Sequence, residues 1–243
     1  MEPFETSAYL VRLVDRNNPE EIRKVQKLRY DHLLRDFDPS LPEDGLDDDG
    51  YDPYAESIVV IDKEKDLFVA TYRLASSDTI QDKEYKCEEE FNIDVLKHHP
   101  EGMLEAGRAV VHKDYRDGAV VNLLWKGFFS YILSHNYRFV VGTTSLHGTD
   151  PTVHTRCTAY LRKNSVDERF NIRAAKNGFE YGELEEDIAL GDPAIPGLLK
   201  TYLLLGAKVS ANGYIDYDFN CCDVFTIVDV QTVNPRMVKF IMK

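Results

Sequence analysis

The sequence predicts a mixed α/β fold in which helices flank a central sheet. Three observations lead to this prediction: strand-like and helix-like segments alternate along most of the 243 residues, two early strands form a hairpin, and an apolar strand leads through a tight turn into an apolar helix. Alternation of this kind is typical of α/β domains. No repeat, low-complexity tract or shift in composition marks a linker, so one domain over residues 1–243 is expected.

The first elements are a predicted strand at 9–14 and a helix from Asn18 to about Arg35. A polar cap, a proline and two acids open this helix, as is usual for helix starts. Arg29 falls beside the apolar stripe of the helix, which makes it a candidate site residue. The alternative is an arginine whose stem runs along the edge of the core.

An acidic loop follows at 36–55, and a loop of this length in a compact domain is usually functional or disordered. Asp47 and Asp48 are expected to stay in water, whereas the rings and stiff backbone beside Asp52 favour pairing of that carboxylate with an arginine. An EF-hand calcium loop is an alternative, but Gly45 stands where the first ligand belongs.

A predicted hairpin of strands at 57–62 and 67–74 comes next, followed by a polar segment at 79–100 with a short helix near its end. The later chain predicts further elements: a strand at 137–144, a turn at 147–151, a helix at 152–163, an ambiguous stretch at 169–181, a helix at 196–206 and a strand at 224–230.

The central strand, residues 103–111, is apolar except at Glu105 and Arg108. Burying an acid and a base costs desolvation energy, so the interruption needs a reason. The turn at 114–118 and the helix from Ala119 to about 136 follow directly, and the first amides of this helix are expected to be unpaired. Such a helix start can hold an anion close to a general base.

Composition excludes several classes of partner. A net charge of −13 disfavours nucleic acids and polybasic membrane anchoring, because both partners are anionic. No apolar run approaches the roughly 18–20 residues that span a bilayer, and the first residues do not resemble a signal peptide, so a cytoplasmic protein is expected. The four cysteines lack zinc-type spacing and are expected to be reduced thiols; no metal is predicted.

Residues 111–118, Val-His-Lys-Asp-Tyr-Arg-Asp-Gly, resemble the cofactor-binding segment of the GNAT acyltransferases. In that family the strand splays open and the turn cradles the pyrophosphate of a pantetheine donor. The resemblance implies a donor site formed by Val110, Val111, Arg116, Asp117 and Gly118. The turn has fewer glycines than in acetyl-CoA enzymes, which favours an acyl-phosphopantetheine donor on acyl carrier protein over coenzyme A, with no permanently bound cofactor.

Four further segments resemble the signature of acyl-homoserine-lactone synthases, and the same pieces occur in ornithine-lipid type (hemolysin-like) N-acyltransferases and N-acyl amino acid synthases. These segments are 28–30, 49–52, 70–74 and 105–108. The later chain favours the ornithine-lipid type, because lactone synthases are shorter and lack segments such as Gly-Thr-Asp-Pro at 148–151 and Asn-Pro-Arg at 234–236. A family-specific extension is therefore expected over about 150–243.

The resemblance implies transfer of a fatty acyl group from acyl carrier protein to the amine of an amino acid, ornithine being the first expectation. The product would be an N-acyl amino acid or lyso-aminolipid, and peripheral contact with the inner membrane through this product is a further expectation. The alternatives are a lactone-synthase-like or acetyl-CoA-dependent enzyme and, in another class, a non-catalytic carrier-binding protein.

Chemistry assigns roles to the same residues. Glu105 is the candidate general base, because acyl transfer to an amine requires a proton acceptor; the alternative is a structural salt bridge with Arg108. The predicted acceptor site contains arginines for a carboxylate and aspartates for an ammonium group or for closing the loop: Arg29, Asp49, Asp52, Arg73 and Arg108. The acidic carrier is expected to meet a basic patch of Lys113, Arg116, Lys126 and Arg138.

Overall fold

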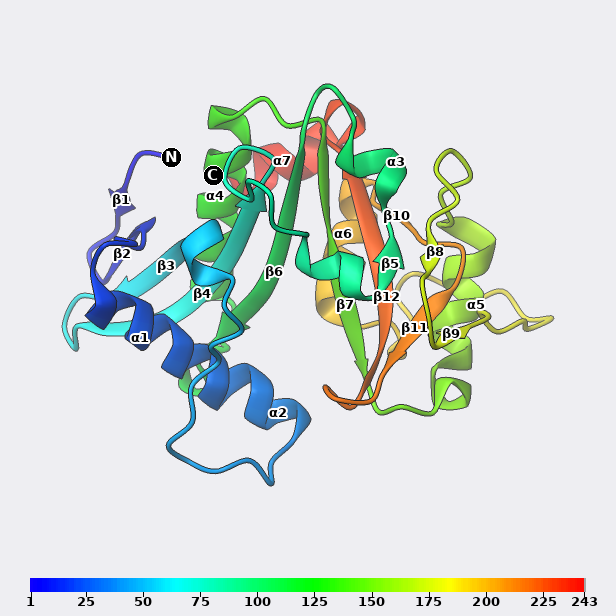
Figure 1. Cartoon of the computed structure of the whole chain (residues 1–243), viewed down its shortest axis with the longest axis horizontal. Helices are drawn as coiled ribbons and strands as arrows, with labels where there is room; N and C mark the ends of the chain where they lie inside the picture. The colour runs from blue at the N-terminus through cyan, green and yellow to red at the C-terminus, as the bar shows by residue number, and fades with distance from the viewer. Residues whose placement is uncertain (243) are drawn as a thin grey trace. The chain divides into compact units, whose positions relative to one another are not determined.

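The computed structural model describes residues 1–242 and has the mixed α/β architecture that the sequence predicts (Figure 1). The chain divides into two compact units. The first unit contains residues 1–83, 106–136 and 239–242. The second contains 84–105 and 137–238. The prediction of a single domain stays a prediction.

The sheet of the first unit has the strand order β1-β2-β3-β4-β6. Its strands are β1 (Phe4–Glu5), β2 (Tyr9–Leu13), β3 (Glu56–Asp62), β4 (Leu67–Ser76) and β6 (Met103–Val111), which passes from the second unit into the first after Glu105. The pairs β1/β2, β2/β3 and β3/β4 are antiparallel. The predicted early strand and hairpin are therefore confirmed.

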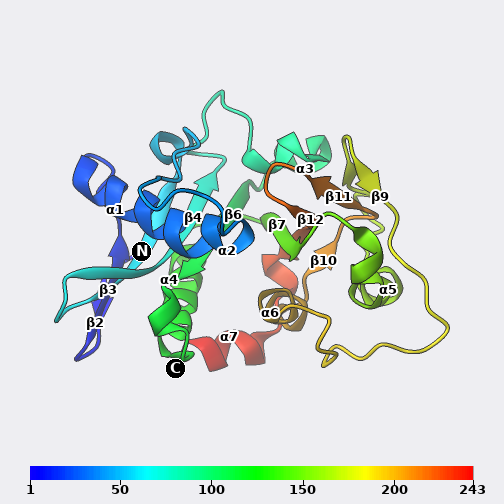
Figure 2. The ribbon, with the colours of Figure 1, turned by 90° about the horizontal axis from the view of Figure 1, so that it is seen from below.

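Helices cover both faces of this sheet. α1 (Pro19–Arg29) packs against β4 on one side, and α4 (Ala119–Ser134) packs against β2, β3 and β4 on the other (Figure 2). The first helix continues through a π-helical segment, Tyr30–Leu34, into α2 (Arg35–Phe37), so it ends close to the predicted position. Two short 3₁₀ helices, Asp52–Tyr54 and Lys113–Tyr115, lie in the loops.

The second unit has a sheet of order β6-β7-β12-β11-β9, and β10 also pairs with β12. β6 runs parallel to β7 at Met103–Glu105, whereas β12 is antiparallel to both β7 and β11. The added strands are β7 (Phe139–His147), β9 (Gly178–Phe179), β10 (Lys208–Val209), β11 (Gly213–Asp216) and β12 (Cys221–Asp229). A separate pair is formed by β5 (Phe91–Asn92) and β8 (Arg173–Ala174).

Only some of the remaining helical segments occur near predicted positions. The remaining segments are the 3₁₀ segment Lys86–Glu89, α3 (Asp94–Lys97), the 3₁₀ segment Pro151–His154, α5 (Thr155–Asn164), α6 (Gly197–Leu205), the 3₁₀ segment Val230–Thr232 and α7 (Pro235–Ile241). α5 and α6 share a core with β7 and β12, which includes Leu146, Leu161, Leu199 and Val224. The short strands β1, β5, β8, β9, β10 and β11, the 3₁₀ segments at 86–89 and 230–232 and helix α7 were not predicted.

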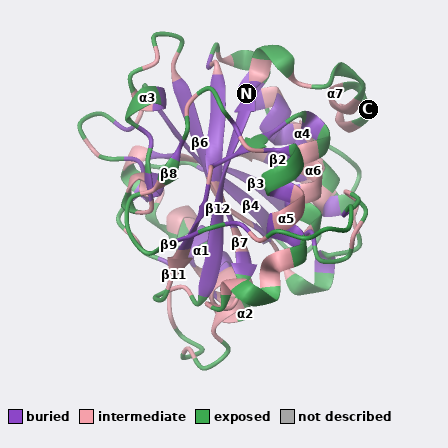
Figure 3. Cartoon of the chain, turned by 90° about the vertical axis from the view of Figure 1, so that its right-hand side faces the viewer, coloured by how far each residue is buried: buried purple, intermediate pink, exposed green. Residues whose placement is uncertain are grey.

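The long strands β3, β4, β7 and β12 are mostly buried, and many exposed residues lie on loops and outer helix faces (Figure 3). All four cysteines are buried free thiols, and Cys87, Cys157, Cys221 and Cys222 all belong to the second unit. Among the described residues, every helix is too short or too polar to cross a lipid bilayer.

Candidate active site

The acidic loop of the first unit closes onto α1 through a fully buried arginine. Arg29 donates two parallel hydrogen bonds to the carboxylate of Asp52, with Nη1 2.7 Å from Oδ1 and Nη2 2.8 Å from Oδ2. Its Nη2 also donates to the Asp47 carbonyl, and its Nε lies 2.8 Å from Asp47 Oδ2. Gln26 donates to Asp52 from the previous turn of the helix. The expected pairing of Asp52 with an arginine is confirmed.

Two more arginines extend this contact. Arg73 on β4 binds both oxygens of Asp49, at 2.6 and 2.8 Å. Arg108 on β6 lies between two aspartates, with Nε 3.0 Å from Asp47 Oδ2 and Nη2 3.4 Å from Asp49 Oδ2. Arg73 Nη1 is also 4.0 Å from Asp52 Oδ1.

These six side chains form a closed ring of alternating charge, which we call the Arg–Asp ring: Arg29, Asp47, Arg108, Asp49, Arg73 and Asp52. Burial alone would raise the pKa values of Asp49 and Asp52, but the neighbouring arginines hold both pKa values below the ordinary range. Asp49 and Asp52 are therefore carboxylates near neutral pH. The ring contains all five predicted acceptor-site residues: Arg29, Asp49, Asp52, Arg73 and Arg108.

The position of Asp47 contradicts one prediction. It was expected to stay in water, but its side chain is 4% exposed and contacts both Arg29 and Arg108. The sequence offered no signal for this, because Asp47 and the exposed Asp48 stand side by side in the same acidic run. Local charge predicts a solvated face and cannot tell which carboxylate points inward.

The arginines of the ring differ in exposure. The side chains of Arg29 and Arg73 are 0% and 6% exposed, and their planar forks are occupied by Asp52 and Asp49. The Arg108 side chain is 20% exposed and makes the longest of the ring's hydrogen bonds, 3.4 Å to Asp49. Arg108 also has a positive φ of 56°, uncommon for a residue other than glycine, so the strand is irregular at this point.

Glu105 lies in the second unit, where its carboxylate receives two backbone amides. Oε1 accepts from the Cys87 amide at 2.7 Å and Oε2 from the Lys86 amide at 2.9 Å. These amides open the 3₁₀ segment Lys86–Glu89, so Glu105 caps its start.

Acidic groups surround this part of the second unit. Burial, Asp223 and Asp216 raise the pKa of Glu90 to about 9. Asp216, Cys221 and Asp223 could each offer one ligand atom to a metal ion. Cys221 donates to Asp223 Oδ2 at 3.2 Å, however, and burial raises the pKa of its thiol, so the sulfur is protonated rather than a thiolate ligand.

The predicted donor turn lies between β6 and α4 in the first unit. Gly118, with a φ of 96°, caps the helix in a conformation that glycine adopts easily. Asp117 Oδ1 accepts from the Ala119 amide at 3.0 Å, so the expectation of unpaired first amides is wrong for Ala119. Arg116 donates to the carbonyl of Val111 and to Asp36, which ties the turn to the end of the strand and to α2.

Two histidines, His32 and His112, lie beside this turn. The rings of His32, on the π-helical segment, and His112 are 4.0 Å apart between centroids. Burial, followed by His112, lowers the pKa of His32 to about 4, so this histidine is neutral near pH 7.

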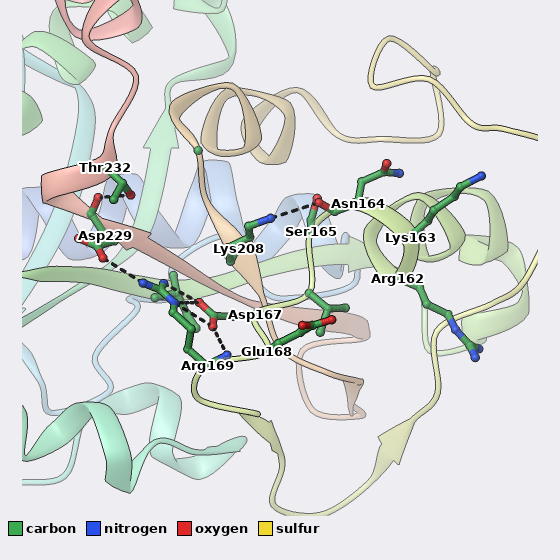
Figure 4. A pocket seen from close by; sticks show the side chains of 13 residues that line it. Arg162, Lys163, Asn164, Ser165, Asp167, Glu168, Arg169, Lys208, Asp229 and Thr232 are labelled. Carbon is green, nitrogen blue, oxygen red and sulfur yellow. Dashed lines mark hydrogen bonds and ion pairs between the residues drawn. The ribbon is translucent and has the colours of Figure 1, made fainter.

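A separate cavity of about 470 Å³ lies in the second unit and is lined by other residues. It contains charged side chains that are already paired: Arg169 binds Asp167 and Asp229 (Figure 4). Lys208, at its wall, donates to the Asn164 carbonyl. None of the predicted site residues is among the described residues that line it.

The comparisons with known proteins agree with this architecture. A sequence model described as an acetyltransferase (GNAT) domain matches residues 28–126. A CoA-dependent acyl-homoserine lactone synthase, BjaI, solved with SAM and isopentyl-CoA, has a similar fold, with a TM-score of 0.53 and 14% identity over 96% of this chain and 87% of that one. FeeM, an N-acyl amino acid synthase from uncultured soil microbes, has a TM-score of 0.51 at 9% identity, over 93% and 94% of the two chains. The protein is an acyltransferase of the GNAT class.

Sequence relatives define the group within this class. An L-ornithine N(alpha)-acyltransferase of Rhodobacter capsulatus is 31% identical over 96% of this chain and 94% of the relative. A protein of the same name from Agrobacterium fabrum is 27% identical over 92% of this chain and 82% of its own length. The chain belongs to the family of the L-ornithine N(alpha)-acyltransferases.

Proposed function

We propose that this protein transfers a fatty acyl group from acyl carrier protein to the α-amine of ornithine. The observation that carries the proposal is the 31% identity to an L-ornithine N(alpha)-acyltransferase over nearly the full length of both chains. The residues predicted for the acceptor, Arg29, Asp49, Asp52, Arg73 and Arg108, gathered in one ring, support it.

The reaction requires one proton acceptor. The α-ammonium group loses a proton, the free amine attacks the thioester carbonyl, and a C–N bond forms. The C–S bond then breaks and the sulfur leaves with the electron pair. The nitrogen then loses a second proton. Of the two protons that the nitrogen has lost, one binds the thiolate and the other is released. Glu105 is the proposed base, directly or through water, because it is the one acid on β6, the strand that leads to the donor turn.

The acceptor's carboxylate is proposed to bind Arg108. This arginine has the most exposed side chain of the three in the Arg–Asp ring, and its contact with Asp49 is the longest there. Exchanging this contact for a substrate carboxylate would cost less than opening the bidentate Arg29–Asp52 pair. Asp49, released from Arg108, would still be held by Arg73.

The donor is proposed to bind through the turn that contains Val110, Val111, Arg116, Asp117 and Gly118. Gly118 leaves the backbone accessible there, since a Cβ at this position would meet no atom within 4 Å. Acyl carrier protein is the proposed donor because this turn already contains the Asp117 carboxylate, which disfavours the more highly charged phosphates of coenzyme A.

The test is acyl transfer by the purified protein, followed by mass spectrometry. The donors are acyl carrier protein and coenzyme A loaded with the same long acyl chain, and the acceptors are ornithine, Nα-acetylornithine and Nδ-acetylornithine. We expect acylation of ornithine and of the Nδ-blocked compound but not of the Nα-blocked one, with the carrier protein as the better donor.

Glu105→Gln is the variant that tests the base, because it keeps the shape and one of the two amide contacts while removing the proton acceptor. We expect its kcat to fall by about 10²–10⁴-fold. Product formed from Nα-acetylornithine alone, or no product with any acceptor, would contradict the proposed function. A wild-type kcat for Glu105→Gln would remove only Glu105 from it.

A further inference from the structure

Lys83 places its ammonium group against two tyrosine rings of the acidic loop, in the first unit. Its Nζ lies 4.5 Å from the ring centroid of Tyr51 and 5.1 Å from that of Tyr54. Both distances are within the roughly 6 Å over which an aromatic face attracts a cation. Among the residues that the structure describes, none forms an ion pair with Lys83. Tyr51 and Tyr54, which we call the tyrosine cage, therefore hold an alkylammonium group without help from a carboxylate.

Backbone contacts fix the tyrosine cage next to the Arg–Asp ring. Tyr54 donates its amide to the Tyr51 carbonyl at 2.9 Å, within the 3₁₀ turn that contains Asp52. The Tyr51 amide donates to Asp49 Oδ1 at 3.2 Å. The Arg73 guanidinium lies 5.4 Å from the Tyr51 ring centroid. The cage is therefore built on the same turn that closes onto the ring.

Lys83 itself comes from a more exposed segment. It follows Gln81 and Asp82, which are both exposed, and Lys83 is partly buried, whereas Tyr51 is only 6% exposed. A lysine side chain is long and flexible. Moving this one out of the cage breaks no side-chain hydrogen bond or ion pair within the described part of the chain. A second ammonium ion can therefore replace it at little cost.

The tyrosine cage also adjoins the arginine proposed to bind the acceptor's carboxylate. Asp49 contacts Arg108 through Oδ2 and the Tyr51 amide through Oδ1. Ornithine carries a carboxylate near one end of a short aliphatic chain and a primary ammonium group, on its δ-carbon, at the other. This δ-ammonium has the same chemistry as the group that Lys83 places in the cage. An acceptor held at both ends keeps its α-amine for the acyl transfer.

We propose that Tyr51 and Tyr54 form the binding subsite for the δ-ammonium group of the acceptor, and that Lys83 occupies this subsite until the acceptor displaces it. This inference rests on the proposed function. The subsite favours a diamino acid over an amino acid whose side chain ends in a methyl group, because a neutral chain gains no cation–π attraction. Lys83 competes with the acceptor and so weakens its apparent binding.

The test compares ornithine with norvaline, which has the same carbon chain but lacks the δ-amine. Tyr54→Leu removes one aromatic face, so we expect the preference for ornithine over norvaline, measured as kcat/KM, to fall about 3–10-fold. Tyr54→Phe keeps the aromatic face and should keep the preference. Tyr217→Leu removes a tyrosine ring that is 66% exposed in the other unit and should also keep it.

A second variant tests the competition. Lys83→Met keeps an unbranched side chain and removes its charge, so we expect the KM for ornithine to fall about 2–5-fold. An unchanged preference in Tyr54→Leu overturns the inference. A higher KM for ornithine in Lys83→Met overturns it as well, since Lys83 would then support binding instead of competing.

These results are distinguishable from a failure of the proposed function. A wild-type protein that acylates ornithine, combined with a Tyr54→Leu variant of unchanged preference, keeps the proposed function and removes the tyrosine cage from it. A wild-type protein that acylates neither ornithine nor norvaline overturns both.

Discussion

At the scale of single residues, the Arg–Asp ring decides which acids of the loop matter. Asp47 and Asp52 have side chains that are 4% and 7% exposed and bind the fully buried Arg29, whereas Asp48 is exposed. Removing one partner of a buried ion pair leaves the other charge without compensation. The ring therefore stabilises the loop that it closes, in addition to any contact with a substrate.

We predict that Asp47→Asn and Asp52→Asn each lower the free energy of unfolding by about 3–5 kcal/mol. Asp48→Asn, the matched control one residue away, should change it by less than about 0.5 kcal/mol. Equilibrium unfolding in urea measures all three. Equal, small changes at the three positions would show that the ring contributes nothing to stability.

A second residue-scale prediction concerns pH. Burial and the neighbouring Asp223 raise the pKa of Glu90 to about 9 from an ordinary value of 4.5. Between these two values the folded protein holds a proton that the unfolded chain releases, so stability falls as pH rises through this window. Glu90→Gln, which needs no proton, should raise the unfolding temperature more at pH 8.5 than at pH 5. A gain that is the same at both pH values would contradict the shifted pKa.

The sequence predicted part of the site at this scale. Arg29 was singled out because it stands beside an apolar stripe, and Asp52 because of the rings beside it; both are in the ring. Asp47 and Glu90 were missed. Their importance comes from contacts between segments distant in the sequence, and neither charge nor periodicity encodes those contacts.

At the scale of elements, the two ends of α6 allow a test of how much a left-handed glycine contributes to stability. Gly206 ends α6 with a φ of 99°, a left-handed conformation that costs other residues energy. We predict that Gly206→Ala lowers the unfolding temperature by about 2–4 °C, equivalent to about 1 kcal/mol. Gly197, at the start of the same helix, has no positive φ and an open environment. Gly197→Ala should not lower the temperature, and equal losses at both positions would contradict the argument.

The accuracy of the sequence prediction also depended on element size. The hairpin, β6, α4, α6 and β12 were predicted because each contains enough residues to show a period or a clear start and stop. β1, β8, β9 and β10 contain two residues each and show no period. The irregularity of β6 at Arg108 was expected only through the family resemblance, and a positive φ of 56° now occurs there.

At the scale of the whole molecule, the net charge of −13 makes local positive charge important for an acidic partner. Of the expected basic patch, Arg116 is paired with Asp36 and Arg138 with Asp229, and Arg138 belongs to the other unit. The Lys126 ammonium lies 5.5 Å from the centroid of the Phe4 ring. Lys113 is exposed beside the donor turn and is the cation best suited to meet a carrier protein.

We predict that Lys113→Ala raises the KM for the acyl carrier donor a few-fold at low salt, and that the difference from wild type shrinks as ionic strength rises. Lys176→Ala removes an exposed lysine from the other unit and should have no effect. Steady-state kinetics at two salt concentrations measures both. Identical KM values for Lys113→Ala and Lys176→Ala would exclude steering by Lys113.

The distribution of cysteines gives the molecule a built-in reporter. Every thiol is buried and lies in the second unit, and burial raises the pKa of each thiol. A reagent that modifies thiolates can therefore react only when the second unit opens. The first unit contains no cysteine, so it does not contribute to the reaction. The modification rate of each cysteine would therefore measure how often the second unit opens locally, without any engineered probe.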